Sequence, residues 1–221
     1  MKRPLIINFK NYTEISGERA IRLAKAAQAV AKRQKVEIVV APPQPALAAV
    51  AKNINIPVIC QHLDDENVGA STGYFLPEIA KSYGAVGSLI NHSEHRIEMK
   101  HVARLVERLR NLRMVSIVCA REPWEVMEIS VFHPDFIAVE PPELIGTGRS
   151  VSKENPTIIT KSIEAAGSRS KLICGAGITG KSDVVTAIEL GSQGILVASG
   201  IIKASPWSGK ITELATGMRK S

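Results

Sequence analysis

The residues that could carry acid–base chemistry in this chain stand at the ends of short apolar runs. Phe136–Val139 is one such run, and a glutamate, Glu140, follows it directly. The two prolines after Glu140 cannot donate hydrogen bonds within a sheet, so the chain must leave the predicted strand at this carboxylate. Gly146 and its neighbours supply permissive backbone at the far end of the same segment. We therefore predict that Glu140 lies at the root of a closing loop, as a general base shielded from water on closure.

Polar residues also follow two other apolar runs. Asn8 and Lys10 come directly after the first run of the chain, and His92 and Glu94 come directly after the fourth. We predict that Lys10 is held inward with Glu94 as its partner, because a lysine at the end of a buried strand is seldom left unpaired. If the next helix begins near Ser93, its positive end favours a neutral His92 ring that donates a hydrogen bond.

Each of these residues also has a simpler interpretation. Glu140 could be an exposed carboxylate beside an ordinary proline-rich turn, and Lys10 could be a solvated surface lysine. His92 could cap a helix, or form an i, i+3 metal-ligand pair with His95. The sequence has no HExxH motif and no supporting carboxylate pair, so we expect no metal.

Two turns of small residues follow the last two apolar runs. Gly175–Gly177 ends one run, and Ala198, Ser199 and Gly200 end the other. Small side chains let backbone N–H groups approach an anion closely, and loops after the last two strands of a parallel barrel commonly bind phosphate. Together with the lysine of the first unit, these turns favour a small phosphorylated ligand.

An alternation of strands and helices must position these groups. The pattern of short apolar runs predicts eight strands, at Leu5–Ile7, Val36–Ala41, Pro57–Cys60, Ala85–Ile90, Met114–Cys119, Phe136–Val139, Lys171–Cys174 and Gly194–Val197. Amphipathic spacing and proline or glycine boundaries predict helices at Gly17–Lys32, Pro45–Lys52, Leu76–Tyr83, Glu98–Asn111, Glu122–Ile129, Asn155–Ala166, Lys181–Leu190 and Lys210–Gly217.

Eight such units favour an α/β fold, a compact (β/α)8 barrel that occupies residues 1–221 as a single domain. A doubly wound open sheet is the alternative, but its G-x-G-x-x-G motif does not follow the first strand. In a barrel, all the strand ends named above meet on one face, where active sites of this architecture lie.

Composition limits the partners and the location. The net charge of +7 favours anionic ligands in general, but no basic block interleaved with aromatic residues indicates nucleic acid. Cys60, Cys119 and Cys174 are far apart and end apolar runs, which is typical of buried free thiols in a reducing compartment. No apolar run approaches the length needed to cross a membrane, and the N-terminal run is too short for a signal sequence. We expect a soluble, cytoplasmic protein that does not bind nucleic acid or membranes.

Over essentially its whole length the chain resembles the triosephosphate isomerase family, and the archaeal branch most closely. The resemblance rests on five motifs in order, which are Asn8-Phe9-Lys10, Asn91-His92-Ser93-Glu94, the segment 139–148 (VEPPELIGTG), Cys174-Gly175-Ala176-Gly177-Ile178 and Ala198-Ser199-Gly200. It implies interconversion of dihydroxyacetone phosphate and glyceraldehyde 3-phosphate through an enediol(ate), without a metal or organic cofactor. A neutral histidine and a closing lid are this family's own well-known features, so both are carried over by resemblance.

The resemblance also implies roles for individual residues. Glu140 would move a proton between two substrate carbons, His92 would polarise the carbonyl oxygens, and Lys10 would bring positive charge. Binding and supporting roles are implied for Asn8 beside Lys10, for Ile145 and Gly146 in the lid, for Gly177, Ala198 and Ser199 at the phosphate, and for Glu94 with Lys10.

Some residues depart from the family pattern. The lid reads Pro-Pro-Glu-Leu-Ile and the histidine motif continues with His95 and Arg96, both of which fit the archaeal pattern better than the bacterial one. The segment 71–75 matches a loop that reaches into a partner subunit, but Tyr74 and Phe75 replace the usual polar residues. Archaeal relatives imply a homotetramer, with a dimer as the alternative.

The sequence has two alternative functional interpretations. A different cofactor-free phosphate-binding barrel, such as a sugar-phosphate epimerase or an indole-forming lyase, would need other groups after the fourth and sixth strands. A barrel without catalytic activity that only binds anions or nucleic acid would need no catalytic groups at these positions.

Overall fold

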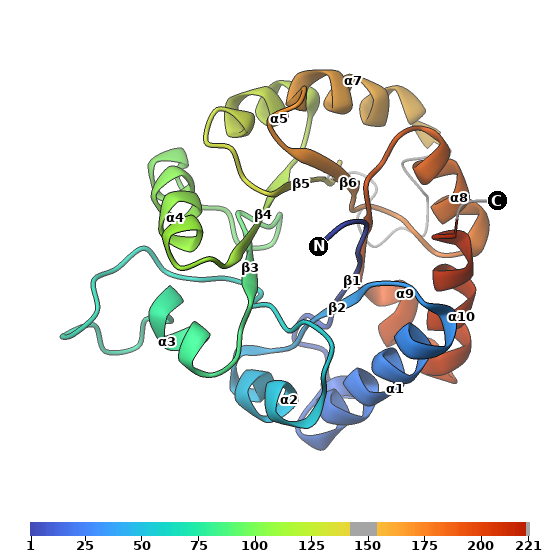
Figure 1. The fold of residues 1–221 in the computed structure, drawn as a ribbon, viewed down its shortest axis with the longest axis horizontal. Coiled ribbons are helices and arrows are strands. Elements are labelled where there is room, and N and C mark those ends of the chain that lie inside the picture. Colours follow the sequence, from blue (N-terminus) through green and yellow to red (C-terminus); the bar gives the residue numbers. More distant parts are fainter. Residues whose placement is uncertain (142–153, 220–221) are drawn as a thin grey trace.

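The computed structural model describes residues 1–141 and 154–219. Within them, seven parallel strands form one sheet in the order β2–β1–β7–β6–β5–β4–β3. The strands are β1 (Leu5–Asn8), β2 (Ile38–Ala41), β3 (Gly87–Ile90), β4 (Val115–Ala120), β5 (Phe136–Val139), β6 (Lys171–Cys174) and β7 (Ile195–Val197). Figure 1 shows the ring that they form from one end, with the helices outside it. Strands covered on both faces must be apolar almost throughout, which explains their short hydrophobic runs.

The segment Pro57–Cys60, predicted as a strand, closes the ring between β2 and β3 through two isolated parallel bridges. On one side the Ile59 amide donates to the Val40 carbonyl at 2.9 Å, and on the other the Cys60 amide donates to the Gly87 carbonyl at 2.9 Å. The prediction of a regular strand was therefore wrong in detail. Pro57 has no amide hydrogen, and the pairing passes from β2 to β3 within a few residues, so no continuous ladder forms. The segment nevertheless fills the eighth position, and the prediction of a (β/α)8 barrel is confirmed.

Helices cover the outside of the ring in chain order. They are α1 (Glu18–Gln34), α2 (Leu47–Asn53), α3 (Pro77–Ser82), α4 (Met99–Asn111), α5 (Pro123–Ser130), α7 (Pro156–Ala166), α8 (Lys181–Glu189), α9 (Ser199–Ile202) and α10 (Trp207–Gly217), with short 3-10 turns at η1 (Thr13–Ile15) and η2 (Gln44–Ala46). No helix in the described part of the chain is both long and apolar enough to span a bilayer.

The structure bears on the predicted helices at two positions that matter for the site. The helix after β3 begins at Met99, within one residue of the predicted start at Glu98, and the alternative start near Ser93 is wrong, because residues 93–95 form a turn closed by a hydrogen bond from the His95 amide to the His92 carbonyl at 2.8 Å. The short helix α9, directly after β7, was not predicted. Its four residues are too few to produce a helical period in the sequence.

The core has two layers, as a barrel requires. Side chains that point into the ring include Ile59, Leu89 and Ile173, and they form one buried cluster. The alternate side chains point outward and pack under the helices in a second, larger cluster. Ile59 lies in the inner cluster while Val58 and Cys60 lie in the outer one, so the segment between β2 and β3 alternates like a strand.

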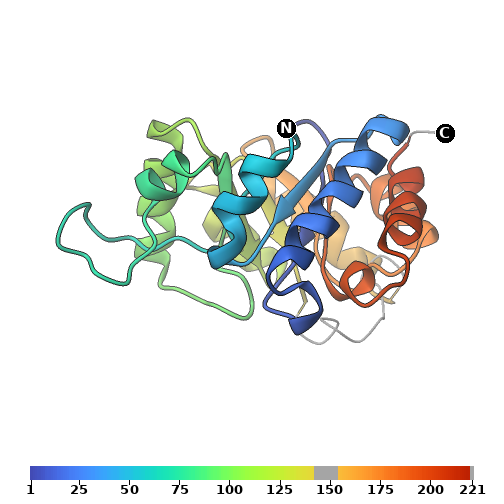
Figure 2. The same cartoon turned by 90° about the horizontal axis from the view of Figure 1, so that it is seen from below.

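Residues 64–75 form a loop that projects well beyond the ring and its helices, as both Figure 1 and Figure 2 show. The base of the loop is anchored by pairing between its ends and by contacts with α4, where Asp65 lies 2.8 Å from the His101 ring and the Glu66 carbonyl accepts from Arg108 at 2.6 Å. The Asp64 amide donates to the Phe75 carbonyl at 2.9 Å, and the Asp64 carboxylate accepts from the Phe75 amide at 2.7 Å. Val68 and Tyr74 between them are 58% and 52% exposed. The loop thus carries apolar surface away from the barrel.

Candidate active site

A cavity of about 320 Å³ opens where the strands end. Its described lining comes from the segments after β1, β3, β5, β6 and β7, and consists of Asn8, Lys10, Tyr12, His92, Glu140, residues 175–179, residues 196–200 and Lys203. The structure therefore brings together, in one cavity, every predicted site residue that it describes except Glu94. Glu94 contacts the site through its ion pair with Lys10. Ile145 and Gly146, predicted for the lid, lie outside the described residues.

Lys10 leaves β1 with a left-handed backbone, at φ 50°. A residue with a side chain pays roughly 1–3 kcal/mol for this conformation, so its surroundings must hold it there. The Asn8 side chain accepts a hydrogen bond from the Lys10 amide at 3.0 Å, and the Gln61 side chain donates to the Lys10 carbonyl at 3.0 Å. The Lys10 ammonium lies 2.6 Å from a carboxylate oxygen of Glu94, which is the predicted pairing. Hydrogen bonds thus hold the Lys10 backbone in place, and the ion pair with Glu94 holds its ammonium group.

The hydrogen bonds of His92 define its tautomer. Its Nδ1 accepts a hydrogen bond from the Glu94 amide at 3.2 Å. An amide N–H can only donate, so Nδ1 carries a lone pair and the ring proton of the neutral imidazole is on Nε2. That Nε2 lies 3.6 Å from Oε1 of Glu140. The amide that contacts the ring thus belongs to a turn and not to a helix terminus near Ser93, since α4 begins at Met99.

Glu140 ends β5 in a buried position and is only 4% exposed. Its amide donates to the Ala120 carbonyl at 2.8 Å, which continues the ladder with β4 and fixes the backbone. Its second carboxylate oxygen, Oε2, is buried and accepts no hydrogen bond from the described residues. A buried carboxylate oxygen without a donor is unstable when charged, which makes it an avid proton acceptor.

The surroundings change the basicity of Glu140. Burial raises the pKa of its carboxyl above the ordinary value, because the charged form loses solvation. The His92 ring, the Cys119 thiol and the Lys10 ammonium lower this pKa again, in that order, and Glu94 raises it, but burial is the largest effect. A raised pKa brings a carboxylate closer to the basicity needed to remove a proton from carbon at neutral pH.

Two neighbours of Glu140 could not be identified from sequence. A Cβ at Gly175 would lie 2.5 Å from the Glu140 Cγ, so only glycine leaves room for this side chain. Cys119 lies on the adjacent strand, and burial followed by the nearby Glu140 charge raises the pKa of its thiol. The sequence predicts Cys119 only as a buried free thiol, because its closeness to Glu140 depends on the register between β4 and β5.

A buried polar network fixes the turn that carries His92. Asn91 adopts φ 61°, its side-chain amide donates to the Cys119 carbonyl at 3.1 Å, and its side-chain oxygen accepts from the Ile97 amide at 3.1 Å. Arg96 is paired with the buried carboxylate of Glu125 and contacts the Asn91 carbonyl. These contacts tie the turn to β4 and α5, so His92 is rigidly positioned.

The turns after β6 and β7 line the far end of the cavity. Gly177 has φ 69°, a conformation that glycine adopts without cost. No backbone or side-chain acceptor in residues 1–141 or 154–219 takes a hydrogen bond from the amides of Gly177 and Ser199. These two amides therefore have no acceptor among the described residues, and their binding of an anion stays a prediction.

A sequence model described as triosephosphate isomerase matches residues 4–214 of the chain. The chain belongs to the triosephosphate isomerase family. Individual members of this family are similar to it over nearly their full lengths. The triosephosphate isomerase of Cenarchaeum symbiosum is 51% identical over 216 residues, covering 97% of each chain. That of Methanothermus fervidus is 44% identical over 222 residues, covering 99% of this chain and all of its own.

A third triosephosphate isomerase, from Methanocaldococcus jannaschii, is 40% identical over 213 residues, covering 95% of this chain and 97% of its own. All three source organisms are archaea, so the predicted membership of the archaeal branch is confirmed. Because the coverage is nearly complete in both directions, the family match applies to the whole barrel and to each of the strand ends that line the cavity.

Proposed function

We propose that Glu140, His92 and Lys10 carry out the reaction of the triosephosphate isomerase family, the interconversion of dihydroxyacetone phosphate and D-glyceraldehyde 3-phosphate in glycolysis and gluconeogenesis. One observation carries the assignment of roles. A buried carboxylate and the Nε2 of an imidazole lie 3.6 Å apart at the edge of a cavity that a lysine also lines. A base beside donors for a developing oxyanion is the arrangement that proton abstraction next to a carbonyl requires.

The proposed reaction begins with proton removal from carbon 1 of the ketose by the Glu140 carboxylate. The electron pair of the broken C–H bond forms the C1–C2 double bond, and the carbonyl electrons move to the oxygen on carbon 2. His92 donates a hydrogen bond from Nε2 to this oxygen, and the Lys10 ammonium stabilises its charge. The hydroxyl proton on the carbon 1 oxygen then passes to the carbon 2 oxygen by way of His92, whose Nε2 gives its proton to the carbon 2 oxygen and takes one from the carbon 1 oxygen. Glu140 returns its proton to carbon 2 as the oxygen on carbon 1 becomes a carbonyl. In these reaction steps, the charged groups of the protein that act on the substrate are all side chains.

The phosphate would lie at the other end of the cavity. The amides of Gly177, Ala198 and Ser199 are proposed to bind it, with Asn8 beside the reacting carbons. Ile145 and Gly146 are proposed lid residues by resemblance alone. A closed lid would exclude water from an enediolate that otherwise loses its phosphate group.

A coupled assay with D-glyceraldehyde 3-phosphate tests this function. We expect isomerase turnover that is unchanged by EDTA, since no step needs a metal. A sugar-phosphate substrate of another barrel enzyme serves as the control and should give no product. Salt-sensitive binding of an oligonucleotide without any isomerisation would contradict the proposal and support an anion-binding barrel.

We also infer that the chain forms a homo-oligomer in the cytoplasm, with a tetramer as the expected state and a dimer as the alternative. Its buried free thiols fit a reducing compartment. Two separate surfaces support two kinds of contact between subunits. One is the projecting loop, residues 64–75 (Figure 2). The other, the α5 stripe, is formed by Trp124 and Met127 on α5 and by Val131 directly after it, which are 60%, 58% and 59% exposed.

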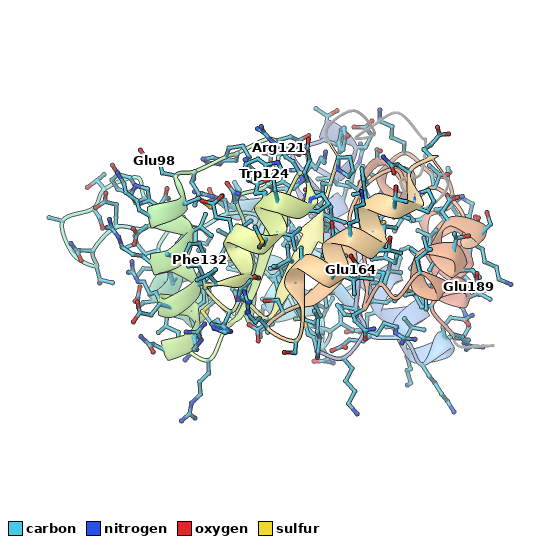
Figure 3. All side chains as sticks on the ribbon, turned by 90° about the horizontal axis from the view of Figure 1, so that it is seen from above. Glu98, Arg121, Trp124, Phe132, Glu164 and Glu189 are labelled. Carbon is cyan, nitrogen blue, oxygen red and sulfur yellow. The ribbon has the colours of Figure 1, made fainter. Side chains whose placement is uncertain are left out.

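Figure 3 shows Trp124 at the outer surface of α5, away from the barrel. Large apolar side chains at spacings of three and four residues lie on one face of a helix, and such an exposed stripe is typical of a subunit interface. A dimer needs only one of the two surfaces. The presence of both favours the tetramer.

Charged substitutions in the α5 stripe should divide the assembly. We expect Trp124→Glu combined with Met127→Glu to reduce a tetramer to dimers, because each buried carboxylate would lack a partner. Analytical ultracentrifugation measures the mass. Arg22→Glu, on the exposed side of α1, is the control and should leave the mass unchanged. A double variant with the mass of the wild type would remove α5 from the interface.

A further inference from the structure

Lys203 lines the same cavity as Glu140 and has no part in the function described so far. It ends the short helix α9, with its amide donating to the Ser199 carbonyl at 3.1 Å. The ordinary interpretation of such a lysine is a solvated charge at a helix C-terminus. Lys203 is exposed, as that interpretation requires, but its ammonium group also has an aromatic partner beside the cavity.

The Lys203 ammonium lies over the ring of Tyr12, 5.5 Å from the ring centroid. Tyr12 follows the first strand and Lys203 follows the last, and both side chains line the cavity. The ammonium therefore extends toward the first strand's loop and the cavity, where a cation–π contact worth about 0.5–1 kcal/mol at an exposed site favours it. The Tyr12 ring thus provides a contact that favours one position of the flexible Lys203 side chain.

Charge balance gives this position a consequence. The Lys10 ammonium is paired with Glu94 at 2.6 Å, and Glu140 adds a negative charge to the cavity. Without another cation, a phosphate dianion would enter a cavity whose net charge is negative. In residues 1–141 and 154–219, no carboxylate is paired with the Lys203 ammonium. Among the described lining residues, Lys203 supplies the positive charge that is not already balanced.

We propose that Lys203, held beside the cavity by Tyr12, is a substrate-positioning residue that binds the phosphate group of the triose together with the amides of Gly177 and Ser199. This inference rests on the proposed function for the identity of the substrate. It extends that function by adding a side-chain cation to the backbone amides. An ammonium held at the mouth of the cavity also attracts the dianion before it is bound.

The proposal separates binding from chemistry. Lys203 contacts the phosphate and not the reacting carbons, so it stabilises the ground state and the transition state equally. Lys203→Gln should therefore raise KM for glyceraldehyde 3-phosphate by about tenfold or more, as for loss of a hydrogen bond to a charged group, and leave kcat within about twofold. The dependence of kcat/KM on ionic strength should weaken as well.

The experiment compares Lys203→Gln, Lys203→Arg and Tyr12→Leu with the full-length wild type. Steady-state kinetics gives kcat and KM, and calorimetric titration with inorganic phosphate gives a readout that does not depend on activity. Lys203→Arg should remain within about threefold of wild type because it keeps the charge, and Tyr12→Leu should fall between the two lysine variants. Lys25→Gln, an exposed lysine on α1, is the control for the loss of one charge and should match the wild type in both measurements.

The two measurements distinguish the failure of this inference from the failure of the proposed function. Weaker phosphate binding by Lys203→Gln in a protein without isomerase activity would support Lys203 and overturn the function. An active wild type whose phosphate affinity and KM are unchanged by Lys203→Gln would overturn Lys203 alone. A loss of kcat with unchanged KM would also overturn it, since that would place Lys203 at the chemical step. A melting curve for each variant shows whether it is folded.

Discussion

Replacing Glu140 by glutamine lowers kcat for glyceraldehyde 3-phosphate by about 10²–10⁴-fold, the usual contribution of a general base. The amide has nearly the same shape but no lone pair of useful basicity, so substrate binding should change little. Glu140→Asp should also lose orders of magnitude, because shortening the side chain by one methylene withdraws the carboxylate from the substrate carbon. Single-turnover and steady-state kinetics check both variants. Glu140→Asp with wild-type kcat would remove Glu140 from the base role.

The stability of Glu140→Gln is the control for this experiment, and its sign follows from burial. The folded-state pKa of Glu140 is raised, so the folded chain binds more protons than the unfolded chain between the ordinary and the raised pKa. The free energy of unfolding of the wild type therefore falls as the pH rises through that window. Glutamine does not ionise, so at neutral pH the variant should melt higher than the wild type, by about 2–4 °C for each kcal/mol relieved. The difference should disappear below the ordinary carboxyl pKa.

The same raised pKa defines the acid side of the rate profile. Catalysis needs the carboxylate, so kcat/KM of the wild type should fall as the pH drops through the raised pKa of Glu140. This decline should occur at a higher pH than for an ordinary glutamate. Substrate is itself a titrating dianion, so the profile is compared with that of inorganic phosphate binding. An acid limb at the ordinary carboxyl pKa would contradict the burial argument.

Removing the ring of His92 has the second large effect. His92→Gln should lower kcat by about 10²–10³-fold, as for the loss of one preorganised donor to a developing oxyanion. The Nε2–H is held in place by the amide of Glu94, which occupies Nδ1, and a glutamine amide has no such restraint. Steady-state kinetics measures the loss. KM should change by much less than kcat.

A histidine far from the cavity gives the matched control for His92→Gln. His133 lies in the turn after α5 with φ 56°, a conformation that asparagine tolerates. His133→Asn should retain wild-type activity. If His92→Gln also retained it, the donor at the oxyanion would have to be another group, and Lys10 would be the next candidate.

Much of this site could be predicted because its residues stand where strands end. Asn8, Lys10, His92 and Glu140 each follow a buried apolar run, and parallel strands that close a ring bring those ends together. The pairing of Lys10 with Glu94 followed from the rarity of unpaired lysines at such positions. Their roles in catalysis are still predictions, and the experiments above test them.

What could not be predicted depends on contacts that no local pattern encodes. Gly175 and Cys119 come close to Glu140 only through the register between neighbouring strands. The helix terminus expected beside His92 is a turn instead, and the Glu94 amide in that turn contacts the ring, because the start of α4 depends on the network around Asn91 and Arg96. Lys203 lies near Tyr12 only after the first and last units of the barrel meet.

The absence of a side chain at Gly175 matters for any attempt to build this active site into another protein. Copying the glutamate, histidine and lysine into another barrel would not be enough, since any side chain on the next strand would occupy the volume taken by the Glu140 methylene groups. The recipient scaffold must carry a glycine on one side of the glutamate and a small thiol-sized residue on the other. The position of the Glu140 carboxylate thus depends on the residues of the two neighbouring strands. A search for similar sites in other scaffolds should first look for a glycine beside the glutamate.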